Sequence, residues 1–160
     1  MLAPDEQAVT HLPAGEGETL WVLGVFATLK VQSNDVSFYE GIVPPEAGPP
    51  SNVHHQQDEA YYVLEGTFSF LSGDETINTG PGSFVWIPRG TVHTFKNIGE
   101  STGKLLFSST FPGSHERFFR EVGVPVDDIA TFEPPEGPPD MEKVLASAER
   151  NDIHFVLAED

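Results

Sequence analysis

Short apolar runs separated by turn residues dominate the first two thirds of the chain. Two runs rich in Val, Phe, Leu and Ile cover residues 21–30 and 36–43, and the Ser-Asn-Asp sequence at 33–35 favours a turn between them. Prolines at 44–50 then predict an extended loop, because proline has no N–H for a strand ladder. Beyond this loop we expect strands at 52–56, 59–64, 67–72, 75–79, 83–87, 92–97 and 103–110.

The segments between the later strands have turn chemistry. From residue 65 onward each of them contains a glycine, and Pro88-Arg89-Gly90 supplies the proline and glycine that a type I turn prefers. Many short strands with turns about every eight to twelve residues are typical of sandwiches and barrels. The sequence therefore predicts an all-β fold.

The pattern changes near residue 113. Ser114 can cap a short helix over 115–122 that Gly123 ends, and Asp140 can cap a second helix with Met141, Val144, Leu145 and Ala148 on one face. A proline-rich acidic loop at 125–139 separates them, and a short apolar tail at 154–157 can return to the barrel. We divide the chain into an N-terminal arm (1–19), a β-barrel (20–112) and a helical extension packed on the barrel (113–160).

Composition limits the possible chemistry and partners. The chain has 160 residues, which suits one domain, and no cysteine, so disulfides and thiolate metal sites are excluded. A net charge of −17 argues against nucleic-acid and anionic membrane partners. The N-terminus has no basic region of a signal peptide, and no apolar run approaches the ~20 residues of a membrane span. We expect a soluble cytoplasmic protein.

Candidate metal ligands lie between residues 48 and 97. Alternation along a strand places Asn52, His54 and Gln56 on one face, so Glu59 is one step out of phase and needs a bulge or strand change near 57–58. His93 follows the Pro-Arg-Gly turn near the start of its own strand. Two imidazoles and a carboxylate suit a non-haem metal site. Spacing alone also permits the alternative that these are ordinary strand and loop residues.

Two motifs in this region resemble those of the cupin superfamily. The second, G-x5-P-x-G-x2-H-x3-N, is met in full by Gly82, Pro88, Gly90, His93 and Asn97. The first, G-x5-H-x-H-x(3–4)-E-x6-G, is matched by His54, Glu59 and Gly66, while its opening glycine is displaced to Gly48. The resemblance covers residues 20–112. It implies a double-stranded β-helix, or jelly roll, with short C-terminal helices and one metal bound by the motif residues.

The sequence around the motifs is similar to small single-domain cupins of the quercetin-2,3-dioxygenase-like group. Dioxygenases of that group bind a flavonol to a divalent metal, and O₂ cleaves the central ring with release of CO. The resemblance implies that His54, Glu59 and His93 bind one divalent transition metal (Fe, Mn, Ni, Co, Cu or Zn). It also implies that Glu59 acts as the catalytic base for a small-molecule substrate.

The chain departs from the family pattern at Asn52, where the first motif has a histidine. Asn52 can coordinate the metal through its amide oxygen, or it can hydrogen-bond a water while His54, Glu59 and His93 hold the metal. The third outcome is a lost metal and a polar ligand pocket. A non-catalytic binding or sensing cupin is therefore the alternative function, and a cupin isomerase is a third possibility that lacks a recognisable second acid/base pair.

The remaining polar and apolar residues have simpler interpretations. We expect His55 to face outward or lie at a subunit contact, Gln56 to lie at the rim, and His11, His115 and His154 to be surface or packing residues. If both faces of the segments 68–71 and 84–87 are apolar, one of the two faces needs cover. This pattern favours a homodimer.

Overall fold

Strands form most of the structure. The computed structural model describes residues 8–156. The strands are β1 (Glu18–Val22), β2 (Val25–Gln32), β3 (Val36–Val43), β4 (Asn52–Val53), β5 (Glu59–Glu65), β6 (Phe68–Ser72), β7 (Glu75–Thr79), β8 (Phe84–Ile87), β9 (His93–Asn97), β10 (Gly103–Thr110), β11 (Val124–Pro125) and β12 (His154–Phe155). The helices are α1 (Ser114–Val122) and α2 (Met141–Arg150).

The strands form two antiparallel sheets that face each other. One sheet has seven strands in the order β11-β1-β2-β3-β10-β5-β8, and the other has five in the order β12-β4-β9-β6-β7. Between β3 and β10 the chain crosses repeatedly from one sheet to the other: β3, β5, β8 and β10 lie in the first sheet, and β4, β6, β7 and β9 lie in the second, which is the pattern of a jelly roll. The predicted all-β jelly roll with short C-terminal helices is therefore confirmed.

The barrel core lies between the sheets and follows from the strand alternation. In β10 every second residue is buried, beginning with Gly103, and β3 alternates in the same way. The inward side chains form one apolar cluster of Val25, Leu29, Tyr39, Val43, Tyr61, Val63, Phe68, Phe70, Val85, Ile87, Phe95, Leu105 and Phe107. This cluster supports the strands that carry the candidate ligands.

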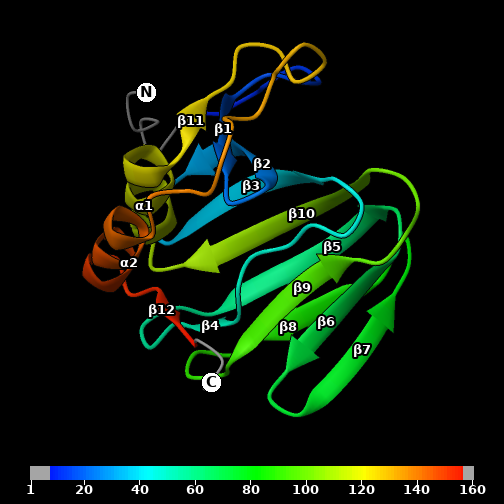
Figure 1. The fold of residues 1–160 in the computed structure, drawn as a ribbon, viewed down its shortest axis with the longest axis vertical. Helices are drawn as coiled ribbons and strands as arrows, with labels where there is room; N and C mark the ends of the chain where they lie inside the picture. The colour runs from blue at the N-terminus through cyan, green and yellow to red at the C-terminus, as the bar shows by residue number, and fades with distance from the viewer. Residues whose placement is uncertain (1–7, 157–160) are drawn as a thin grey trace.

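A second apolar cluster attaches the helices to one side of the barrel. It contains Leu20, Val22, Phe118, Val144, Ala148 and Ile153. Figure 1 shows α1 and α2 together beside β1 and β12. Strand β12 pairs with β4, so the apolar tail returns to the barrel as predicted. Within residues 8–156, neither helix is long and apolar enough to cross a membrane.

Three local predictions were wrong. The run at 21–30 is not one strand: Leu23 and Gly24, both with positive φ, turn the chain between β1 and β2. Both strands are largely buried, so apolar residues continue through the turn, and the apolar pattern gives no sign of where β1 ends and β2 begins. Ser114 is the first residue of α1 rather than its cap, which is Gly113. In α2 the buried face is formed by Val144, Ser147 and Ala148, whereas the expected Met141 and Leu145 are exposed.

Candidate functional site

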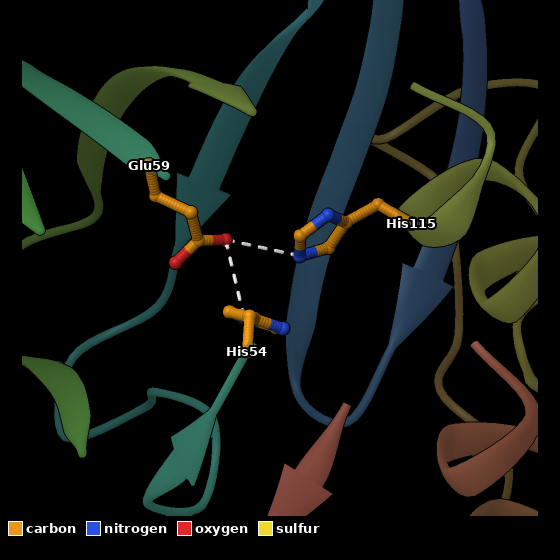
Figure 2. Close-up of side chains that lie close together, drawn as sticks. All are labelled: His54, Glu59 and His115. Carbon is orange, nitrogen blue, oxygen red and sulfur yellow. Dashed lines mark ion pairs between the residues drawn. The ribbon is translucent and has the colours of Figure 1, made fainter. Parts of the chain in front are cut away.

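Four buried side chains from four different segments meet at one end of the barrel. His54 follows β4, Glu59 and His93 begin β5 and β9, and His115 lies in the first turn of α1. Each is at most 6% exposed. Figure 2 shows His54 and His115 approaching the carboxylate of Glu59 from separate elements. The structure therefore brings together the three predicted ligands His54, Glu59 and His93 and adds one residue that was not predicted.

The loop between β4 and β5 gives Glu59 its inward direction. Strand β4 ends at Val53 and β5 begins at Glu59, so the strand change expected near 57–58 is present. Asp58 accepts hydrogen bonds from the backbone N–H of Arg89 and from its Nη2, each at 2.8 Å. The N–H of Gly90 donates to the carbonyl of His54 at 2.6 Å. The Pro-Arg-Gly turn at 88–90 thus fixes the loop between β4 and β5, which carries His54, through hydrogen bonds to Asp58 and His54.

The carboxylate of Glu59 is the centre of the cluster. His93 Nε2 lies 2.6 Å from Oε2, while His115 Nε2 and His54 Nε2 lie 3.0 and 3.4 Å from Oε1. Tyr61 also donates its hydroxyl hydrogen to Oε2 at 3.0 Å. Both carboxylate oxygens are therefore in contact with polar groups, and imidazole nitrogens reach each of them.

Backbone carbonyls orient two of the imidazole rings. His54 Nδ1 lies 2.9 Å from the carbonyl of Asp152, and His93 Nδ1 lies 2.9 Å from the carbonyl of Thr91. A carbonyl can only accept, so each Nδ1 donates to its carbonyl, and Nε2 is the ring atom that faces Glu59. Metal-binding histidines are usually oriented in this way.

Charge in the cluster favours an ionised carboxylate. Burial raises the pKa of Glu59, but the charge of His54 and hydrogen bonds from His115, His54 and His93 outweigh it and hold that pKa well below its ordinary value. For His54, burial lowers the pKa, but the charge of Glu59 and its hydrogen bond raise it above the ordinary value. The centre of the site is therefore a buried anion that attracts a cation or protons.

A cavity of about 90 Å³ adjoins this cluster. A water molecule needs only ~10–15 Å³, so the cavity has room for more than one small group. Its polar lining includes Asn52, His54, Glu59 and His115. Its apolar lining comes from the β1–β2 turn, the barrel core, α1 and the C-terminal segment: Val22, Leu23, Val25, Ala27, Pro49, Phe95, Phe107, Phe118, Phe119, Ile153 and Phe155.

Asn52 is buried at the edge of the cluster. It is 6% exposed, lines the cavity and stands opposite His93 in the pairing of β4 with β9. Its Nδ2 donates to the carbonyl of Pro50 at 2.9 Å, which leaves Oδ1 as the remaining polar atom of the side chain. His55 and Gln56 are exposed, as expected for an outward and a rim residue.

Two site residues were missed from the sequence. The interpretation of His115 as a surface or packing residue was wrong, because it contacts Glu59 directly. Gln57, rather than Gln56, points inward: it is 1% exposed and its Nε2 lies 3.0 Å from His54 Nδ1. The bend after His54 breaks the alternation that places Gln56 on the ligand face. His115 belongs to no motif, and only the docking of α1 reveals its role.

The donor set fits a divalent transition metal. Imidazole nitrogens with one carboxylate suit Fe, Mn, Ni, Co, Cu and Zn. One potential ligand atom from each of His54, Glu59 and His115 lies within 4.8 Å of the others. His93 contacts the same carboxylate through its second oxygen. The spacing and chemistry of these groups are thus compatible with a single ion.

Comparisons with known proteins agree with this architecture. A family model described as a cupin domain matches residues 39–109. An uncharacterized protein of Methanocaldococcus jannaschii is 35% identical over 80 residues, 50% of this chain. A quercetin 2,3-dioxygenase of Bacillus subtilis is 28% identical over 129 residues, 78% of this chain. The matched regions span 64% and 37% of the lengths of these two relatives.

A solved structure has the same fold. KdgF from Halomonas sp. superposes with a TM-score of 0.62 at 15% sequence identity. The match covers 68% of this chain and 98% of KdgF. At this identity the likeness concerns the fold alone.

Proposed function

Because the chain belongs to the cupin superfamily, we propose that it is a metal-dependent dioxygenase acting on an aromatic or enol substrate of the flavonol type. The observation that carries this proposal is the convergence of His54 and His93 on the ionised carboxylate of Glu59 beside an apolar cavity. The similarity to the Bacillus subtilis quercetin 2,3-dioxygenase supports the choice of reaction.

His54, Glu59 and His93 would hold the metal. When bound there, a divalent transition metal would supply a Lewis-acidic centre with positions open to a substrate oxygen and to O₂. Glu59 has a second task as the base. Its lowered pKa leaves the carboxylate unprotonated but makes it a weak base, so the hydroxyl that it deprotonates would have to be made more acidic by the bound metal, while the Tyr61 hydroxyl holds Oε2 in place.

The apolar wall of the cavity would bind the substrate ring. Phe95, Phe107, Phe118 and Phe119 present apolar surface next to the polar cluster. This combination suits a planar molecule with one polar edge; in a cavity of about 90 Å³ only the edge that bears the hydroxyl would enter towards Glu59, and the remaining rings would lie at the cavity opening. Both atoms of O₂ would be incorporated as the ring opens, and CO would leave.

A homodimer is also part of the proposal. Strand β8 is the edge of the seven-stranded sheet and pairs with β5. Four large side chains on these two strands are unusually exposed: Tyr62 (43%), Leu64 (39%), Phe84 (62%) and Trp86 (51%). A second copy of the chain that covers this face would bury them.

A non-catalytic binding or sensing cupin is the second candidate. The specific observation that favours it is Asn52, which stands where the motif has a histidine. A site weakened in this way can still bind a planar ligand in the cavity without reacting with O₂.

Oxygen consumption separates the two candidates. We would load the purified protein with each of the six metals, confirm the metal content, and add quercetin as the probe in an oxygen-electrode cell. The dioxygenase proposal predicts O₂ uptake equal to the flavonol consumed, release of CO, and loss of both in Glu59→Gln. Metal-loaded protein that binds quercetin without O₂ uptake would instead identify a binding module.

A further inference from the structure

Helix α1 places one imidazole, that of His115, beside the three motif residues. Building on the metal site of the proposed function, we propose that His115 of α1 takes the coordinating role that a histidine at position 52 would have. The metal then links helix α1 to the barrel strands that carry His54, Glu59 and His93.

The position of His115 meets the geometric requirement. Its Nε2 lies 3.0 Å from Glu59 Oε1, and its ring centroid lies 5.0 Å from that of His54. Potential ligand atoms of these three residues all lie within 4.8 Å of one another. His115 is also 6% exposed and lines the cavity. It therefore faces the same point as the ligands predicted from the motifs (Figure 2).

The first turn of α1 is fixed on both sides of His115. Ser114 is 1% exposed, accepts a hydrogen bond from Gln57 Nε2 at 3.1 Å and donates to the carbonyl of Asn151. Glu116 is buried, and its Oε2 accepts from the N–H of Gly113 at 2.6 Å. A residue between two buried polar anchors has little freedom, so the direction of His115 towards Glu59 is built into the fold.

Packing alone does not account for an imidazole at this position. The ring lies among Tyr39, Phe107 and Phe119, with centroids 6.2, 6.4 and 5.4 Å away. Its Nδ1 is buried and has no hydrogen-bond partner among residues 8–156. An unpaired buried nitrogen costs ~1–3 kcal/mol, which a leucine or phenylalanine would avoid. The useful polar atom of His115 is therefore Nε2, which points into the site.

The proposed set keeps the donor types of the motifs. A histidine at position 52 would give three imidazoles and one carboxylate, and His115 restores that composition with His54, His93 and Glu59. Asn52 meanwhile uses its Nδ2 for the carbonyl of Pro50. Moving one ligand from β4 to α1 ties the metal to the helix that forms part of the cavity wall.

The test compares three variants of the full chain with wild type, using Cu²⁺ as the probe. His115→Phe removes the imidazole but keeps an aromatic ring among the surrounding aromatic side chains. Asn52→His/His115→Phe returns an imidazole to the strand. His11→Phe is the matched control, since His11 is exposed and lies in the segment before β1. Nitrogen couplings in the EPR spectrum count bound imidazoles, and chelator competition gives the affinity.

The proposal predicts that His115→Phe loses one imidazole coupling and more than the ~10–100-fold affinity that an outer-shell change removes. The double variant should regain the coupling, which a purely structural role of His115 would not produce, and His11→Phe should match wild type. Unchanged couplings and affinity in His115→Phe would overturn the inference while leaving the metal proposal intact. Wild-type protein that binds no Cu²⁺ at the site would overturn both.

Discussion

Gln57 connects the ligand loop to helix α1, and replacing it with leucine should weaken both the fold and metal binding. Its Nε2 donates to Ser114 Oγ and its Oε1 accepts from Ser109 Oγ, each at 3.1 Å. Leucine fills nearly the same space but makes neither bond. The two serines keep other acceptors, the carbonyls of Asn151 and Thr110, so no hydroxyl is left unpaired.

The expected loss follows from these two bonds. A net intramolecular hydrogen bond contributes ~0.5–1.5 kcal/mol, so Gln57→Leu should lower the free energy of unfolding by about 1–3 kcal/mol. For a chain of this size that is a fall in Tm of roughly 2–12 °C. Metal affinity should fall ~10–100-fold, because Gln57 also contacts the ring of His54 and fixes Ser114 beside His115.

Calorimetric melting of the metal-free protein and a chelator-competition titration measure the two effects. Gln56→Leu is the matched control, because Gln56 is the exposed neighbour and should change the free energy of unfolding by no more than ~0.5 kcal/mol. If Gln57→Leu behaves like Gln56→Leu in both assays, the connection from the ligand loop to α1 has no energetic role.

Three further variants test other parts of the structure. Asn52→His should tighten metal binding in a competition titration, and no gain would mean that position 52 does not face the metal. Trp86→Lys should convert the proposed dimer to monomer in light scattering, because a charge would replace an exposed apolar side chain; an unchanged mass would refute this interface. The carboxylate of Glu121 accepts hydrogen bonds from Ser147 and Arg150, and these bonds lower the pKa of Glu121. The bonds therefore stabilise the fold fully above the ordinary pKa of a glutamate, and this stabilisation is lost as the pH falls through the lowered pKa. Glu121→Gln should therefore lower Tm slightly at pH 7 and by progressively less as the pH falls below the ordinary carboxyl pKa, and an effect that does not change with pH would contradict the ion pair.

The sequence predicted the barrel well because its signals are local. Strands β5 to β10 lie within one residue of their expected bounds, since glycine turns separate the apolar runs, whereas β4 ends at Val53 instead of residue 56 and β11 was not predicted. The need for glycine at position 48, by contrast, is tertiary, because a Cβ there would lie 1.9 Å from the carbonyl oxygen of Phe95. The division into arm, barrel and extension stays a prediction, and part of the arm lies outside the described residues.

The helical part of the site was not predictable, because its signals are tertiary. In the sequence, strands β5 to β10 lie between Glu59 and His115. His115 reaches the carboxylate only because α1 docks over the cavity. Gln57 points inward because the chain bends after His54, which alternation along a strand does not describe. Motif spacing identified His54, Glu59 and His93, and packing of α1 and the C-terminal segment completed the cluster.

Metal content measured by elemental analysis tests the central claim most directly. Wild-type protein should hold a near-stoichiometric amount of Fe, Mn, Ni, Co, Cu or Zn after incubation with these ions and gel filtration. His93→Ala should lose that uptake, because it removes the imidazole that lies 2.6 Å from Glu59. Wild-type protein that stays metal-free, or His93→Ala protein that takes up as much metal as wild type, would contradict the account.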